Sequence, residues 1–326
     1  MAAGDDQADT ERDLRRSPWG ALAARPALSA VLGALCIAFS GILVRLSGVS
    51  PDTAATFRTL YALPALGLLA WMERRRFGPR PVAQRRLAMI AGVFFAADLL
   101  FWHRSIIAVG AGLATVLGNV QVLFVGILAW LLLGERPAAR LMMAVPLVLL
   151  GILLISGILQ EGAFGRDPVL GVVYGVLTSL TYSGFILVLR QGNRDVRRPA
   201  GPLFDATLVA AVVAAAAGWA LGDLDVSPGP QAQGWLVILA LTSQVAGWLL
   251  ISLSLPRLPA AMTSVIITLQ PVASVILAMI ILAEAPSTLQ LVGVALVLAG
   301  VIVAAWRARV PDEAPAAVDA AVGPAG

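Results

Sequence analysis

Long apolar runs, separated by short polar or Gly/Pro-rich breaks, make up most of the chain between residues 27 and 306. Each run has about 20 residues, the length that spans the hydrocarbon core of a bilayer as an α-helix. The pattern predicts ten transmembrane helices, at Ala27–Arg45, Thr53–Trp71, Leu87–Ile107, Gly112–Leu133, Leu141–Ile158, Val169–Leu189, Phe204–Leu221, Gly234–Leu255, Ala261–Leu282 and Leu289–Trp306.

Composition supports a membrane location. Of the 326 residues, 59% are hydrophobic and 13% are charged, and the mean hydropathy is +0.87; soluble globular domains have about 25% charged residues. We therefore expect an all-α integral membrane protein. Segments 1–26 and 307–326 lack such apolar runs, and we expect them to be disordered cytoplasmic tails. The single cysteine, Cys36, excludes a disulfide framework.

Arginines predict the orientation in the membrane. They concentrate in the loops that follow expected helices 2, 4 and 6, for example in "ERRRFGPRPVAQRR" and "RQGNRDVRR". The loops "SGVSPDT" and "GDLDVSPGPQAQ", which follow helices 1 and 7, contain none. Because positive residues are retained in the cytoplasm, both termini are expected there, in a multi-pass protein of the plasma or inner membrane. This topology explains the basic pI of about 10.1 without nucleic acid, and it allows contact with anionic lipid.

An internal repeat divides the chain. When "GAGLATVLGNVQVLFVGILAWLLLGERP" is shifted forward by 149 positions it falls on "PAAMTSVIITLQPVASVILAMIILAEAP". Glutamine, glutamate and proline coincide in this register: Gln121 with Gln270, Glu135 with Glu284, and Pro137 with Pro286. Residues 27–158 and 169–306 are thus two predicted repeats of five helices each. Since five is odd, the second repeat must enter the membrane from the opposite side, a plan that recurs in secondary transporters.

These paired segments resemble the EamA domains of the drug/metabolite transporter superfamily. The resemblance covers nearly the whole chain between Ala27 and Trp306. It implies ten transmembrane helices in two inverted five-helix EamA repeats, which move small metabolites by alternating access, often outward. Arg58 matches an arginine that such proteins tend to have early in helix 2. Many members have a proline within helix 4; here Pro271 is present in helix 9, whereas Val122 occupies the equivalent place, so we expect a kink in helix 9 and not in helix 4.

The third helix carries an aspartate near its middle. A carboxylate facing lipid at that depth costs roughly 2.5–3.5 kcal/mol, so Asp98 is expected to face protein or water. Trp102 lies one turn further on the same helix face, and the two suit the wall of a polar cavity. Arg58 is the expected partner of Asp98. Whether Asp98 meets substrate or only Arg58 stays open.

His103 and Arg104 point elsewhere. Two interpretations of His103 stand side by side: a proton-coupling or substrate-binding group, because an unperturbed histidine titrates near neutral pH, and a buried neutral side chain bonded to a neighbouring helix. Arg104, near the outer end of the helix, is interpreted first as an interfacial anchor.

Helices 4 and 9 carry a second polar line. Thr115 and Asn119 map through the repeat onto Ser264 and Thr268, and Gln121 maps onto Gln270. Polar groups at equal depth in both repeats would face each other where carriers bind substrate; interhelical hydrogen bonding is the alternative. The candidate substrate-binding residues are Asp98, Trp102, Asn119, Gln121, Gln270, Thr268 and Trp248, and the candidate charge-pair or coupling residues are Arg58, Asp98 and His103.

Two further features have structural explanations. Glu135 and Glu284 end helices 4 and 9 just before a new helix N-terminus, where each is expected to act as a cap. Gly171 and Gly175 form a GxxxG pattern that permits close helix packing.

The favoured function is a secondary transporter of a small amphipathic metabolite, such as an amino acid, working outward. An importer or uniporter of the same fold is the alternative; a membrane enzyme using Asp98 and His103 is a more distant one. No metal or cofactor motif is present, so neither is expected. The expected partners are a small-molecule substrate and the lipid bilayer, without nucleic acid, for a monomer or homodimer.

Overall fold

The computed structural model describes residues 25–133, 139–192, 195, 197–254, 258 and 260–305. Side chains 129, 132–133, 260–265 and 267 lie outside this description, as do both tails, Glu135, Pro137 and Trp306. Every regular element in the described part is helical: α3 (Pro26–Ala38), α4 (Ser40–Ser47), α5 (Pro51–Phe77), α6 (Val82–Val109), α7 (Ala111–Gly118), α8 (Gln121–Leu133), α9 (Ala139–Ile155), α10 (Pro168–Gly192), α11 (Ala200–Leu221), α12 (Pro230–Leu239), a π-helical turn (Ala240–Gly247), α13 (Trp248–Ser254), α14 (Ala260–Ile281) and α15 (Thr288–Ala305).

Seven helical segments of the described chain are long and apolar enough to cross a membrane. Two shorter apolar helices, Ala139–Ile155 and Thr268–Ile281, accompany them. The helical, multi-pass character expected from the hydropathy pattern is thus confirmed, while the count of ten spans stays a prediction.

The fourth predicted helix is interrupted, contrary to expectation. Its two parts, α7 and α8, are separated at Asn119 and Val120, although no proline is present. The Asn119 side chain donates to the Thr115 carbonyl at 2.8 Å, and the Asn119 backbone N–H is shared between the carbonyls of Thr115 and Val116. This local competition with the helical ladder interrupts the helix. By contrast, α14 is an uninterrupted helix through Pro271.

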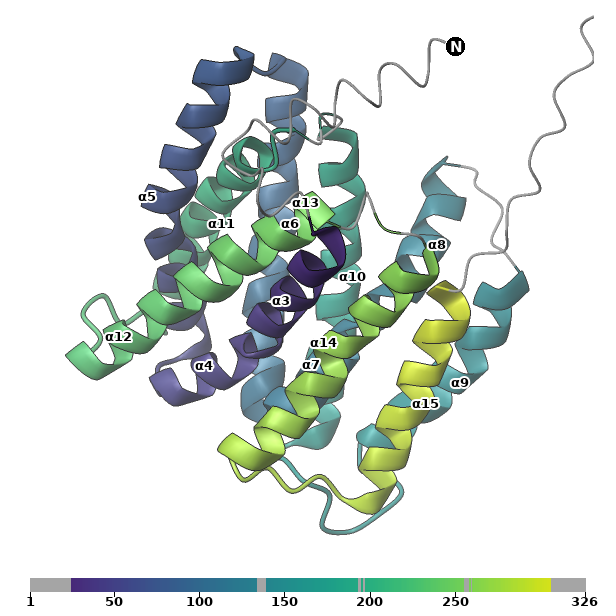
Figure 1. Ribbon diagram of the computed structural model, residues 1–326. Helices are drawn as coiled ribbons and strands as arrows, with labels where there is room; N and C mark the ends of the chain where they lie inside the picture. The colour runs from purple at the N-terminus through teal and green to yellow at the C-terminus, as the bar shows by residue number, and fades with distance from the viewer. Residues whose placement is uncertain are drawn as a thin grey trace, which may run out of the picture.

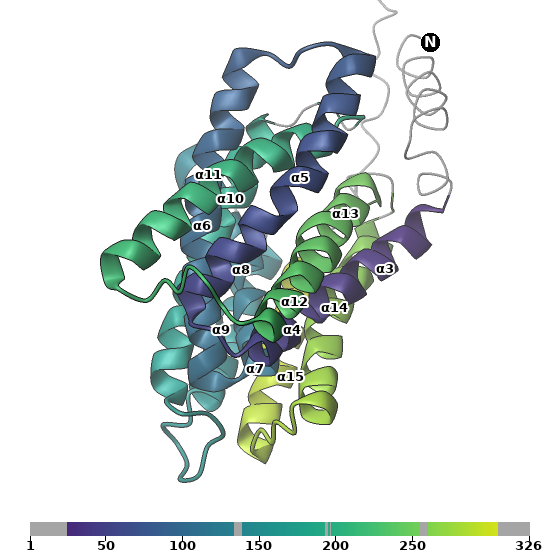
Figure 2. The same ribbon diagram turned by 90° about the vertical axis from the view of Figure 1, so that its left-hand side faces the viewer.

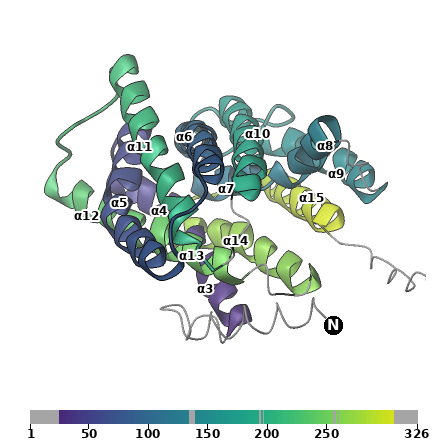
Figure 3. The same ribbon diagram turned by 90° about the horizontal axis from the view of Figure 1, so that it is seen from above.

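The contacts between helices follow a two-fold relation between the two repeats. Helix α5 packs on α11, α7 on α14, and α9 on α15. Each of these contacts joins two helices that are equivalent in the two repeats. The α6–α10 pair of helices 3 and 6 has its counterpart in the α13–α3 pair of helices 8 and 1. Figures 1 and 2 show this bundle in two side views, and Figure 3, seen from above, shows α7 near its middle. The central position of α7 agrees with the complete burial of most of its side chains.

Small residues permit the close approach of α10. A Cβ added to Gly171 would lie 2.5 Å from the Cβ of Val109, and one on Gly175 would lie 2.6 Å from the Cβ of Leu117. The GxxxG pattern therefore lets α10 pack directly against α6 and α7.

One end of the bundle, here named the arginine-poor face, is formed by links 48–50, 156–167, 222–229 and 282–287. Arg104 forms an ion pair there with buried Asp52, with 2.7 Å between Nη1 and Oδ1. This ion pair ties α6 to the start of α5, while the interpretation of Arg104 as an interfacial anchor stays a prediction. The opposite end, the arginine-rich face, carries the α5–α6 link and residues 195–199.

Candidate functional site

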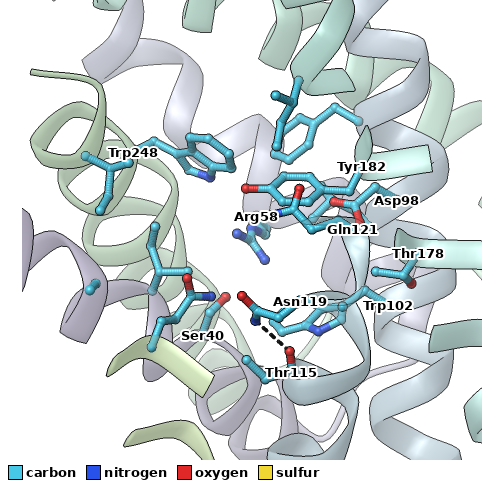
Figure 4. A pocket seen from close by; sticks show the side chains of 18 of the residues that line it. Ser40, Arg58, Asp98, Trp102, Thr115, Asn119, Gln121, Thr178, Tyr182 and Trp248 are labelled. Atoms are coloured by element: carbon cyan, nitrogen blue, oxygen red, sulfur yellow. Dashed lines mark hydrogen bonds between the residues drawn. The ribbon is translucent and has the colours of Figure 1, made fainter. Parts of the chain in front are cut away.

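A cavity of about 250 Å³ lies in the middle of the bundle. Its wall is built from both repeats, by helices α3 to α8 of the first and by α10, α13 and α14 of the second. The polar lining residues are Ser40, Arg58, Asp98, Thr115, Asn119, Gln121, Thr178, Tyr182 and Gln270. Figure 4 labels all of these residues except Gln270 and shows them around a common space.

Aromatic rings form two sides of this cavity. Trp248 makes edge contacts with Phe95 at 6.0 Å and with Tyr182 at 5.9 Å between ring centroids. Trp102 covers another side and lies 5.6 Å beneath the guanidinium of Arg58. The cavity therefore combines charged groups with apolar ring faces, a composition suited to an amphipathic solute.

Arg58 is held by a glutamine from the second repeat. Its Nε donates to Gln244 Oε1 at 3.1 Å, and Gln244 Nε2 donates to Thr207 Oγ1 at 3.2 Å. Gln244 belongs to the π-helical turn, a rare conformation found often at functional sites. The chain of bonds links α5 to helices of the other repeat, and the guanidinium points toward the centre of the cavity in Figure 4.

The expected ion pair between Arg58 and Asp98 is not formed between these two described residues. Both side chains line the cavity and are nearly buried, with 3% and 7% exposure respectively. Within the part of the chain that the structure describes, the only side-chain hydrogen bond of Arg58 goes to Gln244, because the π turn brings that amide to the guanidinium. A cation and a carboxylate therefore share one cavity without neutralising each other by direct contact.

Several polar atoms around the cavity lack a protein partner. Nine buried side-chain atoms have no hydrogen bond in the described part of the chain, and four belong to cavity-lining residues. They are Ser40 Oγ, Arg58 Nη1, Gln121 Oε1 and Thr178 Oγ1. Buried polar groups are normally satisfied, so this concentration marks the groups available to a polar solute.

Among the candidates from sequence, the structure brings Asp98, Trp102, Asn119, Gln121, Gln270 and Trp248 to this cavity, together with Arg58. Thr268 is not among the lining residues, although it lies in α14 only two residues before Gln270. The side chain of Ser264, the repeat partner of Thr115, lies outside the described residues.

His103 does not line the cavity. It is fully buried, and its Nδ1 lies 3.0 Å from the carbonyl oxygen of Pro51. Because a carbonyl only accepts hydrogen bonds, Nδ1 is the donor nitrogen in this contact. The side chain of His103 on α6 therefore contacts the first turn of α5, as expected for a buried histidine bonded to a neighbouring helix.

The cavity is bounded toward the arginine-poor face by the contact between α7 and α14. Ser274 Oγ lies 3.0 Å from Thr115 Oγ1, and a Cβ added to Gly112 would lie 2.9 Å from the Cα of Val275. Glu284 accepts hydrogen bonds from the backbone N–H groups of Ala111 at 2.7 Å and Gly112 at 3.1 Å. The glutamate after helix 9 therefore caps helix 4 of the other repeat, not helix 10 as the sequence suggested.

Sequence reasoning missed Gln244, Thr207, Tyr182, Phe95 and Thr178. All five lie in or beside predicted helices, and each polar one interrupts an apolar run. Polar residues inside expected spans were the available signal, but the π turn that directs Gln244 to Arg58 shows no sequence pattern of its own.

Helical repeats that share a polar cavity at their interface define the architecture of a multi-pass membrane transporter. The sequence profile described as the EamA-like transporter family matches the chain twice, over residues 24–157 and 169–306. The chain therefore belongs to the EamA-like transporter family. This confirms the resemblance seen in the two repeated segments.

Solved structures support the same fold, and 24 of their chains match this one. One, titled only as the crystal structure of a protein, has a TM-score of 0.57 and 19% sequence identity, and the match covers 86% of this chain and 96% of that one. At this identity the likeness shows the fold alone. No curated protein sequence matches the chain.

Proposed function

We propose that the protein is a secondary carrier that moves a small zwitterionic metabolite, an amino acid or a close relative, outward across the cell membrane by alternating access. The observation that carries the proposal is the coexistence of Arg58 and Asp98, unpaired with each other, in one cavity with aromatic walls. An amino acid offers a carboxylate to the guanidinium and an ammonium group to the carboxylate.

The aromatic walls would receive the remaining side chain of such a solute. Trp248, Phe95 and Tyr182 form one continuous cluster, and Trp102 lies opposite Trp248 across the cavity in Figure 4. The volume of about 250 Å³ is below the roughly 300–1,000 Å³ of sites for drug-sized ligands, which favours a metabolite. Asn119, Gln121 and Gln270 would supply further hydrogen bonds.

Release toward the arginine-poor face requires the α7–α14 contact to open, and it must close again when the cavity faces the other side. Besides apolar packing of Val275 and Ala278 on α7, hydrogen bonds made by Thr115, Ser274 and Glu284 hold this contact. Such bonds are replaced by water at little net cost, about 0.5–1.5 kcal/mol each. The free energy needed to open this contact is therefore small enough to be supplied by the binding of a ligand.

Transport by purified protein in proteoliposomes tests the proposal. A panel of labelled neutral amino acids would be compared for wild type, Asp98→Asn and Gln121→Ala. Uptake should fall at least about tenfold in both variants, because each removes a charged or polar ligand group in a site of low dielectric.

Asp225→Asn and Gln231→Ala are matched controls, since both residues are exposed and lie away from the cavity. They should transport as wild type does. Normal transport by Asp98→Asn and Gln121→Ala, or equal loss in the controls, would reject this site. Assays in everted vesicles with imposed gradients would separate export from import.

A further inference from the structure

A second cavity of about 250 Å³ opens at the arginine-rich face, between the end of α5 and the start of α11. Among the described residues, it shares no lining residue with the central cavity. Four arginines, Arg74, Arg80, Arg85 and Arg198, contribute to its wall. The other side is apolar and includes Trp71 and Phe204.

The positive charge of this second cavity is only partly compensated. Arg80 forms an ion pair with Asp205, and the Nε of Arg85 lies 3.6 Å from the same carboxylate. Two guanidinium groups thus share one carboxylate. The side chain of Arg85 is 48% exposed, so it can turn toward another anion while Asp205 keeps its ion pair with Arg80.

Arg198 and Arg74 add to this surplus. Arg198 is bound to Asp195, with 2.9 Å between Nε and Oδ2, and it also donates to the Gly78 carbonyl at 3.0 Å. Arg74 is exposed and forms no ion pair within the part of the chain that the structure describes. Its charge is available to a ligand.

The remaining carboxylate, Glu73, is already engaged. Its two oxygens accept from the backbone N–H groups of Ala200 at 2.9 Å and Gly201 at 2.8 Å, at the start of α11. Glu73 follows the apolar run that ends at Trp71, and burial raises its pKa to about 7. The helix terminus is thus filled by Glu73, whose negative charge is reduced near neutral pH, and the arginines dominate the cavity.

The apolar side lies at the depth expected for the membrane boundary. Trp71 is 51% exposed, and the guanidinium of Arg75 lies 4.5 Å above its ring. Tryptophan and arginine at the end of an apolar run are typical of the membrane interface. A ligand here would meet guanidinium groups on one side and apolar side chains on the other.

We propose that this second cavity binds the phosphate-bearing headgroup of an anionic phospholipid from the leaflet at the arginine-rich face. Arginine clusters between helices on the cytoplasmic side are suited to such headgroups, and the apolar wall accommodates the start of the acyl chains. The headgroup would bridge α5 of the first repeat and α11 of the second. The proposal does not depend on the solute of the central cavity.

Native mass spectrometry of the full-length protein, delipidated in detergent, tests the proposal with phosphatidylglycerol as the probe. The double variant Arg74→Ala/Arg85→Ala should bind this lipid roughly thirtyfold more weakly than wild type. The control Arg86→Ala/Arg190→Ala removes the same charge from exposed positions outside the cavity and should bind as wild type does. Size-exclusion elution and the melting temperature verify that all variants are folded.

Three results would overturn the assignment. The first is an equal loss of lipid binding in the two double variants, which would show a diffuse charge effect. The second is equal binding of zwitterionic phosphatidylcholine. The third is displacement of the lipid by millimolar inorganic phosphate, which would show a site for free phosphate. Retention of most binding by Arg74→Lys/Arg85→Lys, with loss in the alanine variant, would support recognition of the anion by these two positions.

Discussion

Arg58 is a buried cation of the first repeat, and a residue of the second repeat, Gln244, sets its orientation. The Gln244 amide accepts from its Nε, and the same amide donates to Thr207. A buried guanidinium is costly unless its N–H groups are bonded, so Gln244 stabilises the charge while leaving Nη1 without a protein partner. We infer that Gln244 is a positioning residue that presents the cation to the solute.

Replacing Gln244 by leucine tests this role. The Arg58 Nε–H would lose its acceptor, at a cost of about 1–3 kcal/mol, and the guanidinium would turn away from its present direction. We expect the KM for a carboxylate-bearing solute to rise roughly tenfold with a smaller change in maximal rate, measured by transport in proteoliposomes.

Thr207→Val removes only the second bond of this chain and should have a weaker effect in the same direction. Thr242→Val is the control, because the Thr242 hydroxyl bonds to its own helix and is exposed. An unchanged KM in Gln244→Leu would show that Arg58 is positioned without Gln244.

Positions of side chains could be predicted from the sequence where they depend on the geometry of a single helix. Asp98 and Trp102 were placed on a shared cavity wall by helical spacing and by the cost of a lipid-facing carboxylate. The partner of Arg58 was not found, because the choice between Asp98 and Gln244 depends on the π turn and on the packing of α5 against helices of the second repeat. Spacing along the chain does not encode these distances.

At the level of elements, the contact between α7 and α14 bounds the central cavity. Gly112 is at its closest point, where an added Cβ would overlap the backbone of Val275. The Glu284 cap on Ala111 and Gly112 fixes the same end of α7. Any change that separates these helices should therefore favour conformations open toward the arginine-poor face.

Gly112→Ala should produce that shift. Overpacking of this kind costs about 1–3 kcal/mol, which changes the ratio of two conformations roughly fivefold or more. The readout is the labelling rate of Ser40→Cys, a cavity residue, by an impermeant thiol reagent added at the arginine-poor face, in a background carrying Cys36→Ser.

Gly118→Ala is the matched control for this shift, because a Cβ there would make ordinary contacts of 3.6 Å and 3.9 Å. Labelling should be faster in Gly112→Ala and unchanged in Gly118→Ala. Equal rates in the two variants would mean that this contact does not control access.

Most helix positions followed from apolar runs, but their interruptions did not. Helix α14 continues through Pro271, where the predicted kink stays a prediction, whereas the break at Asn119 comes from a side chain that bonds its own backbone. Glu284 was correctly expected to cap a helix, yet the capped helix belongs to the other repeat. Which helix a glutamate caps depends on contacts between segments far apart in the sequence. These contacts cannot be predicted from a single sequence without its fold.

At the level of the whole molecule, equivalent helices of the two repeats pack against each other, and the cavity lies where they meet. The family profile covers both repeats. Two similar halves can exchange roles in an inverted pair, which would expose the same cavity alternately to each side.

Solute counterflow tests this account most directly. Proteoliposomes loaded with an unlabelled amino acid would be diluted into the labelled one, with no other gradient. An alternating-access carrier should accumulate label transiently above its equilibrium level in wild type and Asp225→Asn, but not in Asp98→Asn. Absence of accumulation for every zwitterionic solute tested, or equal accumulation in Asp98→Asn, would contradict the assignment of the central cavity as the transport site.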